Sequence, residues 1–257
     1  MGVIGGQLGI RILTWLSPTG ENQNLDGRAY RDRSKLEVLF DADFFDVIRG
    51  KTVIDFGCGV GDEAIEMLHR GAARVIAIDV RQKFLDEGRA RAEAAGLSDR
   101  IVFTTAADEP ADVVVSLDGF EHYDDPAAVL NFMTRCLKPG GRVIISFGTT
   151  WYHPFGGHIF SPIPWAHLLF TDRAMVAWRK RSHPEQTART IEECGLNKMT
   201  IGRFERYVEA SPLRFARYEI RPIRRARKLW MPLTREFFTS VVQATLVPRT
   251  PHEGATA

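Results

Sequence analysis

The sequence predicts an α/β fold in which parallel strands alternate with helices. A short buried strand at 52–54 leads through a glycine-rich loop into a helix that opens at Asp62. The run 112–117 is rich in β-branched residues and suits a central strand buried on both faces. Five such strands, with helices between them, follow one another at the spacing of crossover connections, which is typical of a doubly wound sheet.

The expected strands are apolar or β-branched runs bounded by turn formers. They cover residues 52–54, 74–78, 101–105, 112–117 and 142–147. Helices are expected from Asp62, over 83–95 with Gly96 as C-cap, and from Asp125-Pro126 to Leu137. The segment 138–141, Lys-Pro-Gly-Gly, predicts a tight turn, because proline stops a helix and glycine permits positive φ.

Two further helices are expected before the first strand. Residues 1–16 suit a short amphipathic helix, and 17–29 are rich in turn formers. Apolar residues recur at helical spacing over 34–48, with Ser34 as N-cap and Glu37 in the capping-box position. This second helix is expected to cover one face of the sheet.

Composition indicates one sizeable domain with additions. The chain has 257 residues, 44% of them hydrophobic, and a formal net charge of +2, so global charge favours neither nucleic acid nor membrane binding. The cysteines Cys58, Cys136 and Cys194 are odd in number and widely spaced, which predicts a reduced, cytoplasmic setting. We find no convincing signal peptide and no apolar run of about eighteen residues that would span a membrane.

The glycine loop has the chemistry of a site for a cationic ligand. It reads D-x-G-x-G-x-G from Asp55 to Gly61, followed by Asp62 and Glu63. These acids would repel the pyrophosphate that a G-x-G-x-x-G loop binds, which opposes a nicotinamide oxidoreductase. Asp79 ends the next strand roughly twenty residues on, where an acid can accept both hydroxyls of a ribose.

Asp55, Gly57, Gly59 and Gly61 resemble motif I of the class I S-adenosylmethionine-dependent methyltransferases. Glu121-His122 after the fourth strand, Asp125-Pro126 and the phrase Leu-Lys-Pro-Gly-Gly at 137–141 are similar to later segments of the same family. The resemblance implies methyl transfer from S-adenosylmethionine to an acceptor, with release of S-adenosylhomocysteine. The aromatic character of the segment after the fifth strand and the lack of a nucleic-acid module favour a small or amphipathic molecule as that acceptor. The resemblance also implies a Rossmann-like doubly wound seven-stranded sheet of order 3-2-1-4-5-7-6, with strand 7 antiparallel. Segments 213–220 and 239–247 would supply the last two strands.

The resemblance assigns a set of cofactor-binding positions. Tyr30 and Arg33 would meet the methionine carboxylate, although they also suit a helix start with exposed polar side chains. The full set is Tyr30, Arg33, Asp55, Gly57, Cys58, Gly59, Gly61, Asp79, Val80, Ala107, Asp108, Leu117 and Asp118. Of these, Ala107 and Asp108 would lie beside the adenine.

His122 is the best-placed candidate for a catalytic base, with Glu121 to orient it. Alternatively, His122 lines the cofactor or caps the next helix. The histidines of the segment that follows strand 5 are rival bases.

The segment 149–198 departs from the minimal fold and predicts a lid over the substrate. It combines aromatics, prolines, glycines and histidines without clear early secondary structure. Its candidate substrate-binding residues are Tyr152, His153, His158, Trp165 and His167. An aromatic hinge at the fold edge is the alternative, and the histidine spacing disfavours a metal site.

We therefore expect an arm over 1–34 that covers the cofactor, a core over 35–148, the lid over 149–198, a completing segment over 199–247 and a disordered tail over 248–257. Segment 203–228 holds nine Lys or Arg and three Glu, so it is either a solvated face or a basic surface for anionic lipid or RNA. Because the sequence contains no nucleic-acid module, we expect no nucleic-acid partner. We expect a monomer or a homodimer. Peripheral membrane contact through this basic segment is an open possibility. Two alternatives remain for the function: a non-catalytic cofactor-binding module that docks onto a partner, and an aminopropyltransferase-like enzyme.

Overall fold

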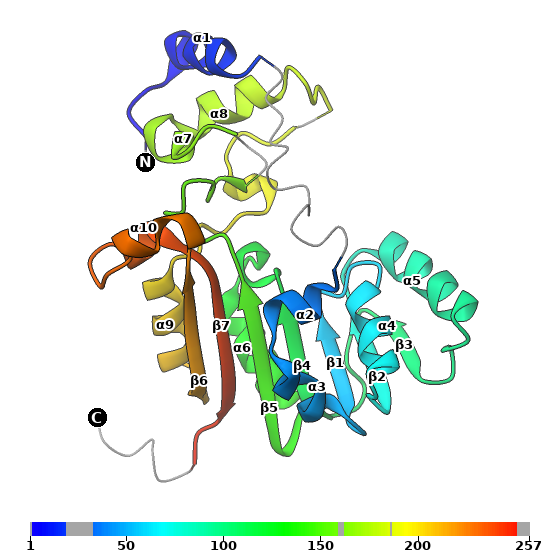
Figure 1. The fold of residues 1–257 in the computed structure, drawn as a ribbon. Coiled ribbons are helices and arrows are strands. Elements are labelled where there is room, and N and C mark those ends of the chain that lie inside the picture. Colours follow the sequence, from blue (N-terminus) through cyan, green and yellow to red (C-terminus); the bar gives the residue numbers. More distant parts are fainter. Residues whose placement is uncertain (1, 19–32, 159–161, 186, 251–257) are drawn as a thin grey trace.

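The computed structural model describes residues 2–18, 33–158, 162–185 and 187–250, and these contain a seven-stranded sheet (Figure 1). The strand order is β3-β2-β1-β4-β5-β7-β6. The strands are β1 (Thr52–Phe56), β2 (Arg74–Ile78), β3 (Ile101–Thr104), β4 (Ala111–Leu117), β5 (Leu137–Phe147), β6 (Leu213–Pro222) and β7 (Thr239–Pro248). The expected order is confirmed.

Parallel pairing gathers the carboxyl ends of β1 to β5 at one edge of the sheet. In β1, Ile54 pairs with Ile76 of β2 on one side and Val114 of β4 on the other. β7 runs antiparallel between β5 and β6, with Ala244 opposite Ile145. The expected antiparallel seventh strand is confirmed, and ligands in such open sheets bind outside the carboxyl ends of the parallel strands.

Helices cover both faces of the sheet and bury two apolar layers. One face packs against α2 (Lys35–Leu39), α3 (Ala42–Ile48), α4 (Asp62–His69) and α5 (Gln82–Ala94). The other packs against α6 (Pro126–Arg135) and α9 (Ile201–Glu209), whose Phe204 lies among the rings of Phe120, Phe147 and Phe215.

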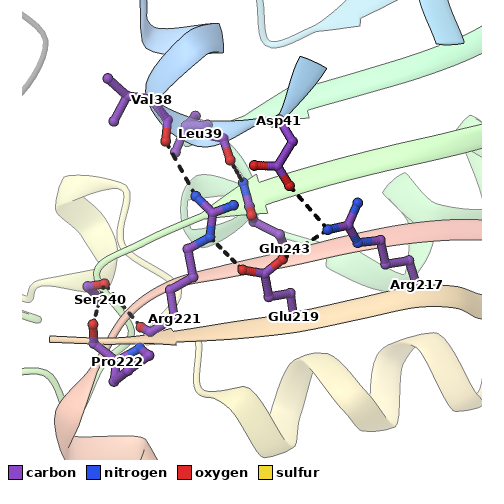
Figure 2. A network of polar contacts seen from close by, with 9 residues as sticks. All are labelled: Val38, Leu39, Asp41, Arg217, Glu219, Arg221, Pro222, Ser240 and Gln243. Carbon is purple, nitrogen blue, oxygen red and sulfur yellow. Dashed lines mark hydrogen bonds and ion pairs between the residues drawn. The ribbon is translucent and has the colours of Figure 1, made fainter. Parts of the chain in front are cut away.

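The single helix expected over 34–48 is wrong, because the chain forms two short helices there. Ser34 does cap the first, accepting a hydrogen bond from the Glu37 amide at 3.1 Å. Phe40 is extended, with φ −119° and ψ 151°, and ends α2. Tertiary contacts hold this break: Gln243 Nε2 on β7 donates to the Leu39 carbonyl at 2.6 Å, and Arg221 Nη1 donates to the Val38 carbonyl at 3.3 Å (Figure 2).

The turn expected at 138–141 is a bulge inside β5. Ala111 pairs with Leu137 and Val113 with Arg142, so the residues between Leu137 and Arg142 are extra in the ladder. Gly140 there has φ +78° and faces open space, which explains why a glycine suits the position.

The lid has an apolar core of its own, which includes the N-terminal helix. Its helices are α1 (Gly6–Leu16), α7 (Ala166–Leu169) and α8 (Asp172–Arg179), followed by the 3₁₀ turn η5 (Glu192–Cys194). Leu13 of α1 is buried with Met175 and Trp178 of α8. In addition, Trp178 Nε1 donates to the Ser17 carbonyl at 3.2 Å. The helix expected in a separate arm therefore packs into the lid, above the sheet in Figure 1.

Two helical turns join β6 to β7, η6 (Arg224–Leu229) and α10 (Arg235–Phe238). No helix in the described part of the chain is long and apolar enough to cross a membrane. Most of the turn-rich segment 17–29 and most of the expected tail over 248–257 lie outside the described residues.

Candidate active site

The glycine loop between β1 and α4 curls against the end of β2. Gly57, Gly59 and Gly61 all have positive φ, at 83°, 54° and 82°. The amides of Gly57 and Cys58 both donate to the Ile78 carbonyl, at 2.8 and 3.0 Å. A Cβ on Gly61 would lie 2.5 Å from the ring of Phe103, so glycine is needed for space as well as conformation.

Asp79 holds the tip of this loop. Its Oδ2 accepts a hydrogen bond from the Gly59 amide at 3.0 Å. Arg81 also contacts the carboxylate: Nε lies 2.9 Å from Oδ1, and Nη2 lies 2.9 Å from Oδ2. Burial alone would raise the pKa of Asp79, but the hydrogen bonds from Arg81 and Gly59 lower it overall. Val80 next to it is 89% exposed, an apolar side chain open to a flat ligand.

Asp55 and Cys58 are buried beneath the loop. Burial raises the pKa of the Asp55 carboxyl to about 8, and the charge of Glu63 acts in the same direction. Asp55 Oδ2 has no hydrogen-bond partner among the described residues, so a donor on a ligand would satisfy it. Burial also raises the pKa of the Cys58 thiol, which therefore stays neutral.

Asp118 follows the buried end of β4 at Leu117 and faces α2. It is a non-glycine residue with φ +49°, and its amide donates to the Ser146 carbonyl at 2.8 Å. Lys35 Nζ lies 2.9 Å from Asp118 Oδ2 and 3.4 Å from Glu63 Oε1. Lys35 thus links α2, the loop helix and the end of β4, a position that the sequence pattern did not reveal.

The remaining cofactor candidates are less closely tied to this cluster. Ala107 is half-buried against the core, and Asp108 beside it is exposed. Arg33 is exposed just before α2, and Tyr30 lies outside the described residues. Lys35, two residues after Arg33, is a cation of this segment that does contact the cluster, through Asp118.

His122 lies in the 3₁₀ turn η3 (Phe120–His122) after β4, with its ring fixed by the lid. Its Nδ1 lies 2.7 Å from the Gly195 carbonyl oxygen. Since a carbonyl only accepts, Nδ1 carries the proton and neutral His122 keeps a lone pair on Nε2. The His122 ring is also 5.5 Å from the ring of His158, centroid to centroid.

Glu121 does not orient His122, which corrects the sequence-based prediction. Neither Glu121 carboxylate oxygen has a hydrogen-bond partner among the described residues, and the partner of His122 Nδ1 is the Gly195 carbonyl. Burial raises the pKa of Glu121 to about 8, and the charge of Asp118 raises it further.

Tyr123 is a residue of this site to which the sequence pattern assigned no role. Its hydroxyl lies 2.8 Å from Ser116 Oγ and 3.1 Å from the Phe56 carbonyl oxygen, so it ties the ends of β1 and β4 together. A Cβ on Gly57 would approach this hydroxyl to 3.1 Å. Its place directly after Glu121-His122 was the only signal available in the sequence.

Two lid histidines, His153 and His167, are buried, and His158 is half-buried. Burial lowers the pKa of His153, His158 and His167 to about 4 in each case. His153 Nδ1 accepts from the Phe155 amide at 3.0 Å, and His167 Nε2 lies 2.6 Å from the Trp151 carbonyl oxygen. Among the described residues, no three His, Cys, Asp or Glu side chains have an arrangement that would hold a metal.

Tyr152 and Trp165 form an aromatic wall beside these histidines. Trp165 Nε1 donates to the Tyr152 carbonyl at 3.0 Å. The rings of Tyr152 and Trp165 face Phe237 and Phe238 of α10, with centroids 5.2 and 6.4 Å apart. Of the lid candidates, His158 is the one in ring contact with His122.

These residues fit S-adenosylmethionine. The loop leaves open space at Gly59, and the acids Asp55, Glu63 and Asp79 surround the loop. A cationic ligand with hydrogen-bond donors suits these acidic side chains better than a ligand with a pyrophosphate does.

Comparison with known proteins also indicates a methyltransferase. Residues 54–145 match the family model described as a methyltransferase domain. A ubiquinone biosynthesis O-methyltransferase from Alkalilimnicola ehrlichii is 30% identical over 189 residues, which is 71% of this chain and 73% of that protein. One from Neisseria meningitidis serogroup C is 32% identical over 158 residues, 58% of this chain. The chain spans 65% of the length of that relative.

Solved structures support the fold. An S-adenosylmethionine-dependent methyltransferase from Mesorhizobium loti superposes with a TM-score of 0.53 at 18% identity, covering 83% of this chain and 95% of the other. The same family is indicated by the order of the strands, by the glycine loop and by the relative from Alkalilimnicola ehrlichii, which is matched over most of its length. The chain therefore belongs to the class I S-adenosylmethionine-dependent methyltransferases, with S-adenosylmethionine as its cofactor.

Proposed function

We propose that this methyltransferase acts on a small, amphipathic acceptor held between His122 and the lid. The observation that carries the proposal is the contact between the rings of His122 and His158, 5.5 Å apart. Through this contact His122 of η3 lies against the lid, at the edge of the sheet where the parallel strands end. An acceptor there would be flanked by aromatic and neutral side chains on the lid side.

The cofactor would be held by the loop and the two strand ends next to it. Asp79 is placed to accept from ribose hydroxyls, Val80 to pack on the adenine, and Asp55 to accept from a donor through its unpartnered Oδ2. S-adenosylmethionine, when bound, supplies a methyl group on a sulfonium sulfur. The chain's own task is then to align an acceptor atom with that group and to exclude water.

His122 would take the proton from the acceptor. Its Nδ1 hydrogen bond to Gly195 leaves Nε2 as the basic nitrogen. His158, held with a lowered pKa of about 4, stays neutral beside it and adds no competing positive charge. An acceptor whose acidic group is a hydroxyl suits this arrangement.

The lid supports an amphipathic acceptor. Tyr152, Trp165 and the neutral histidines offer apolar surface with a few polar atoms, the usual character of a small-molecule site. The relatives named for ubiquinone biosynthesis O-methylation lend further support to transfer onto oxygen in an amphipathic compound.

Binding and turnover test the two halves of the proposal separately. Calorimetric titration should give micromolar affinity for S-adenosylmethionine and S-adenosylhomocysteine, roughly −8 kcal/mol, none for NAD, and loss in Asp79→Ala. S-adenosylhomocysteine release should then be measured with a panel of amphipathic phenols. His122→Ala should lower kcat by roughly 100-fold or more, whereas His69→Ala, on the exposed end of α4, should not.

Each outcome has a clear meaning. Cofactor binding without turnover on any acceptor would favour the non-catalytic docking module. Turnover of decarboxylated cofactor alone would favour aminopropyl transfer. An unchanged rate in His122→Ala would remove the base from the mechanism while leaving the cofactor site in place.

A further inference from the structure

The basic segment 203–228 divides into two parts that differ in their partners. The first part lies on α9 and β6, and three of its cations, Arg203, Arg217 and Arg221, have partners within the fold. Arg203 Nη1 donates to the carbonyls of Asn197 and Lys198 at 2.5 and 3.0 Å. Arg217 pairs with Asp41 and Glu219, and Arg221 pairs with Glu219 (Figure 2). These three side chains therefore offer little free charge to a partner.

The second part lies at the turn between β6 and β7, which we call the β6–β7 tip, residues 223–238. Its cations Arg224, Arg225, Arg227 and Lys228 are exposed. None of the four forms an ion pair or a side-chain hydrogen bond with any residue that the structure describes. Four like charges within five residues repel one another unless an anionic partner is present.

Apolar side chains follow these cations directly and point into solvent. Leu229 is 54% exposed, Met231 49% and Leu233 90%. Large apolar side chains grouped at one turn are uncommon on a surface that faces only water. Cations next to exposed aliphatic side chains are the combination that binds an anionic lipid surface, with the charges at the headgroups and the apolar groups among the acyl chains.

The tip is a fixed structure and so presents these groups together. The Ile223 amide donates to the Phe238 carbonyl at 2.7 Å and closes the base of the tip. Thr234 Oγ1 bonds to the Leu229 carbonyl across the turn. The only acid of the tip, Glu236, faces inward and accepts from the amides of Ile201 and Gly202 at 3.0 and 2.9 Å.

The same geometry argues against nucleic acid. Single-stranded nucleic acid is bound by cations interleaved with exposed aromatic rings on which bases stack. The aromatic ring amid the exposed groups, Trp230, instead donates from Nε1 to Thr239 Oγ1 at 3.0 Å. The exposed apolar side chains next to the cations, Leu229, Met231 and Leu233, are aliphatic, and the ring of Phe237, 38% exposed, contacts Tyr152. This combination fits acyl chains better than stacked bases.

We propose that the β6–β7 tip docks this enzyme onto an anionic lipid surface, through Arg224, Arg225, Arg227 and Lys228 together with Leu229, Met231 and Leu233. The tip lies at the edge of the sheet where the lid begins (Figure 1). Thr150 Oγ1 donates to the Glu236 carbonyl at 3.4 Å, and Phe237 contacts Tyr152. Docking therefore brings the lid to the surface. That the surface also delivers the acceptor rests on the proposed function, whereas docking itself does not.

Vesicle sedimentation tests the proposal with the full chain. The wild type should bind phosphatidylcholine vesicles that contain phosphatidylglycerol and not vesicles of phosphatidylcholine alone, and added NaCl should release it. Arg225→Gln/Arg227→Gln/Lys228→Gln should weaken binding roughly 100-fold. Leu229→Ser/Met231→Ser/Leu233→Ser should also weaken it, with the charge unchanged.

A matched control removes the same charge from the opposite edge of the sheet. Lys51, Arg100 and Arg135 are exposed near the amino ends of β1, β3 and β5, and Lys51→Gln/Arg100→Gln/Arg135→Gln should bind as the wild type does. Equal losses in both charge variants, or no binding by the wild type, would overturn the proposal. So would tight binding of an RNA oligonucleotide by a wild type that ignores vesicles. S-adenosylmethionine titration of each variant keeps this result separate from that of the proposed function.

Discussion

Arg81 occupies both carboxylate oxygens of Asp79, with its Nε and Nη2 each 2.9 Å from one oxygen. The guanidinium also lies over the ring of Phe84, 3.9 Å from its centroid. The acid proposed to receive the ribose is thus already paired, by a side chain that is 58% exposed and has room to move. Cofactor binding should therefore compete with this ion pair.

Arg81→Ala is expected to tighten binding of S-adenosylhomocysteine. A half-exposed ion pair contributes about 1 kcal/mol or less, so its removal should lower Kd by roughly fivefold at most. Calorimetry at low and high salt measures this, because salt screens the pair in the wild type and has nothing to screen in the variant. Weaker binding in Arg81→Ala would show instead that the guanidinium contacts the cofactor.

The glycine loop allows a test that separates backbone conformation from space. Gly61 and Gly140 have similar φ, +82° and +78°, but an added Cβ meets the Phe103 ring at 2.5 Å in the first and nothing within 4 Å in the second. Gly140→Ala should cost about 1 kcal/mol of unfolding free energy from backbone strain. Gly61→Ala should cost roughly 2–4 kcal/mol, because buried Phe103 must also shift.

Urea denaturation of the two variants gives the comparison. Equal losses of stability would mean that Phe103 yields without cost. Gly61→Ala should also weaken S-adenosylhomocysteine binding, whereas Gly140→Ala, in the bulge of β5, should not.

Sequence reasoning located the strands because a short apolar run bounded by turn formers is best buried as a strand of a sheet. Residues 74–78 are recognised by their apolar pattern, and the glycine loop by its need for positive φ. Both signals depend only on residues that are close together in the sequence. The same holds for Ser34 as a helix cap.

What sequence reasoning missed depends on contacts far apart in the chain. The break at Phe40 rests on Gln243 and Arg221, about 200 and 180 positions away. The packing of α1 into the lid likewise joins Leu13 to Trp178. Neither leaves a periodic signal. We predicted that Glu121 orients His122, but the hydrogen-bond partner of His122 Nδ1 is the carbonyl of Gly195, a residue of the lid.

The lid should lose stability in mild acid. In the unfolded chain the histidines titrate near their ordinary pKa of about 6.5, whereas burial lowers the pKa of His153, His158 and His167 to about 4. The unfolded state therefore binds more protons between these values, and the free energy of unfolding falls as pH drops through that window.

His167→Gln should make this fall less steep, since glutamine can donate to the Trp151 carbonyl without titrating. Fluorescence-monitored urea unfolding between about pH 7 and pH 4.5 measures the slope, with Trp151 and Trp178 as probes inside the lid core. His69→Gln, at the exposed end of α4, is the control and should keep the wild-type slope. A slope in His167→Gln as steep as in the wild type would contradict a buried neutral imidazole at that position.

Glu121 predicts the opposite pH dependence. Its carboxyl ionises near pH 4.5 in the unfolded chain but stays protonated to about 8 in the folded protein, because burial raises its pKa. The folded state then holds one more proton within this window, so this group makes the free energy of unfolding fall as pH rises from 4.5 to 8. Glu121→Gln keeps the shape and removes the charge, and should stabilise the protein above about pH 8 by a few kcal/mol.

Urea unfolding at about pH 5 and pH 8.5 separates this effect from a change in packing. The gain in Glu121→Gln should be small at the lower pH and large at the higher one, while Glu93→Gln, exposed on α5, should show no gain at either. The positive charge of Lys35, which pairs with Asp118, lowers the pKa of Glu121, so Lys35→Met should enlarge the loss of stability at high pH. A uniform gain at both pH values would instead assign the effect to hydrogen bonding by the new amide, and would place the ionisation of Glu121 at its ordinary value.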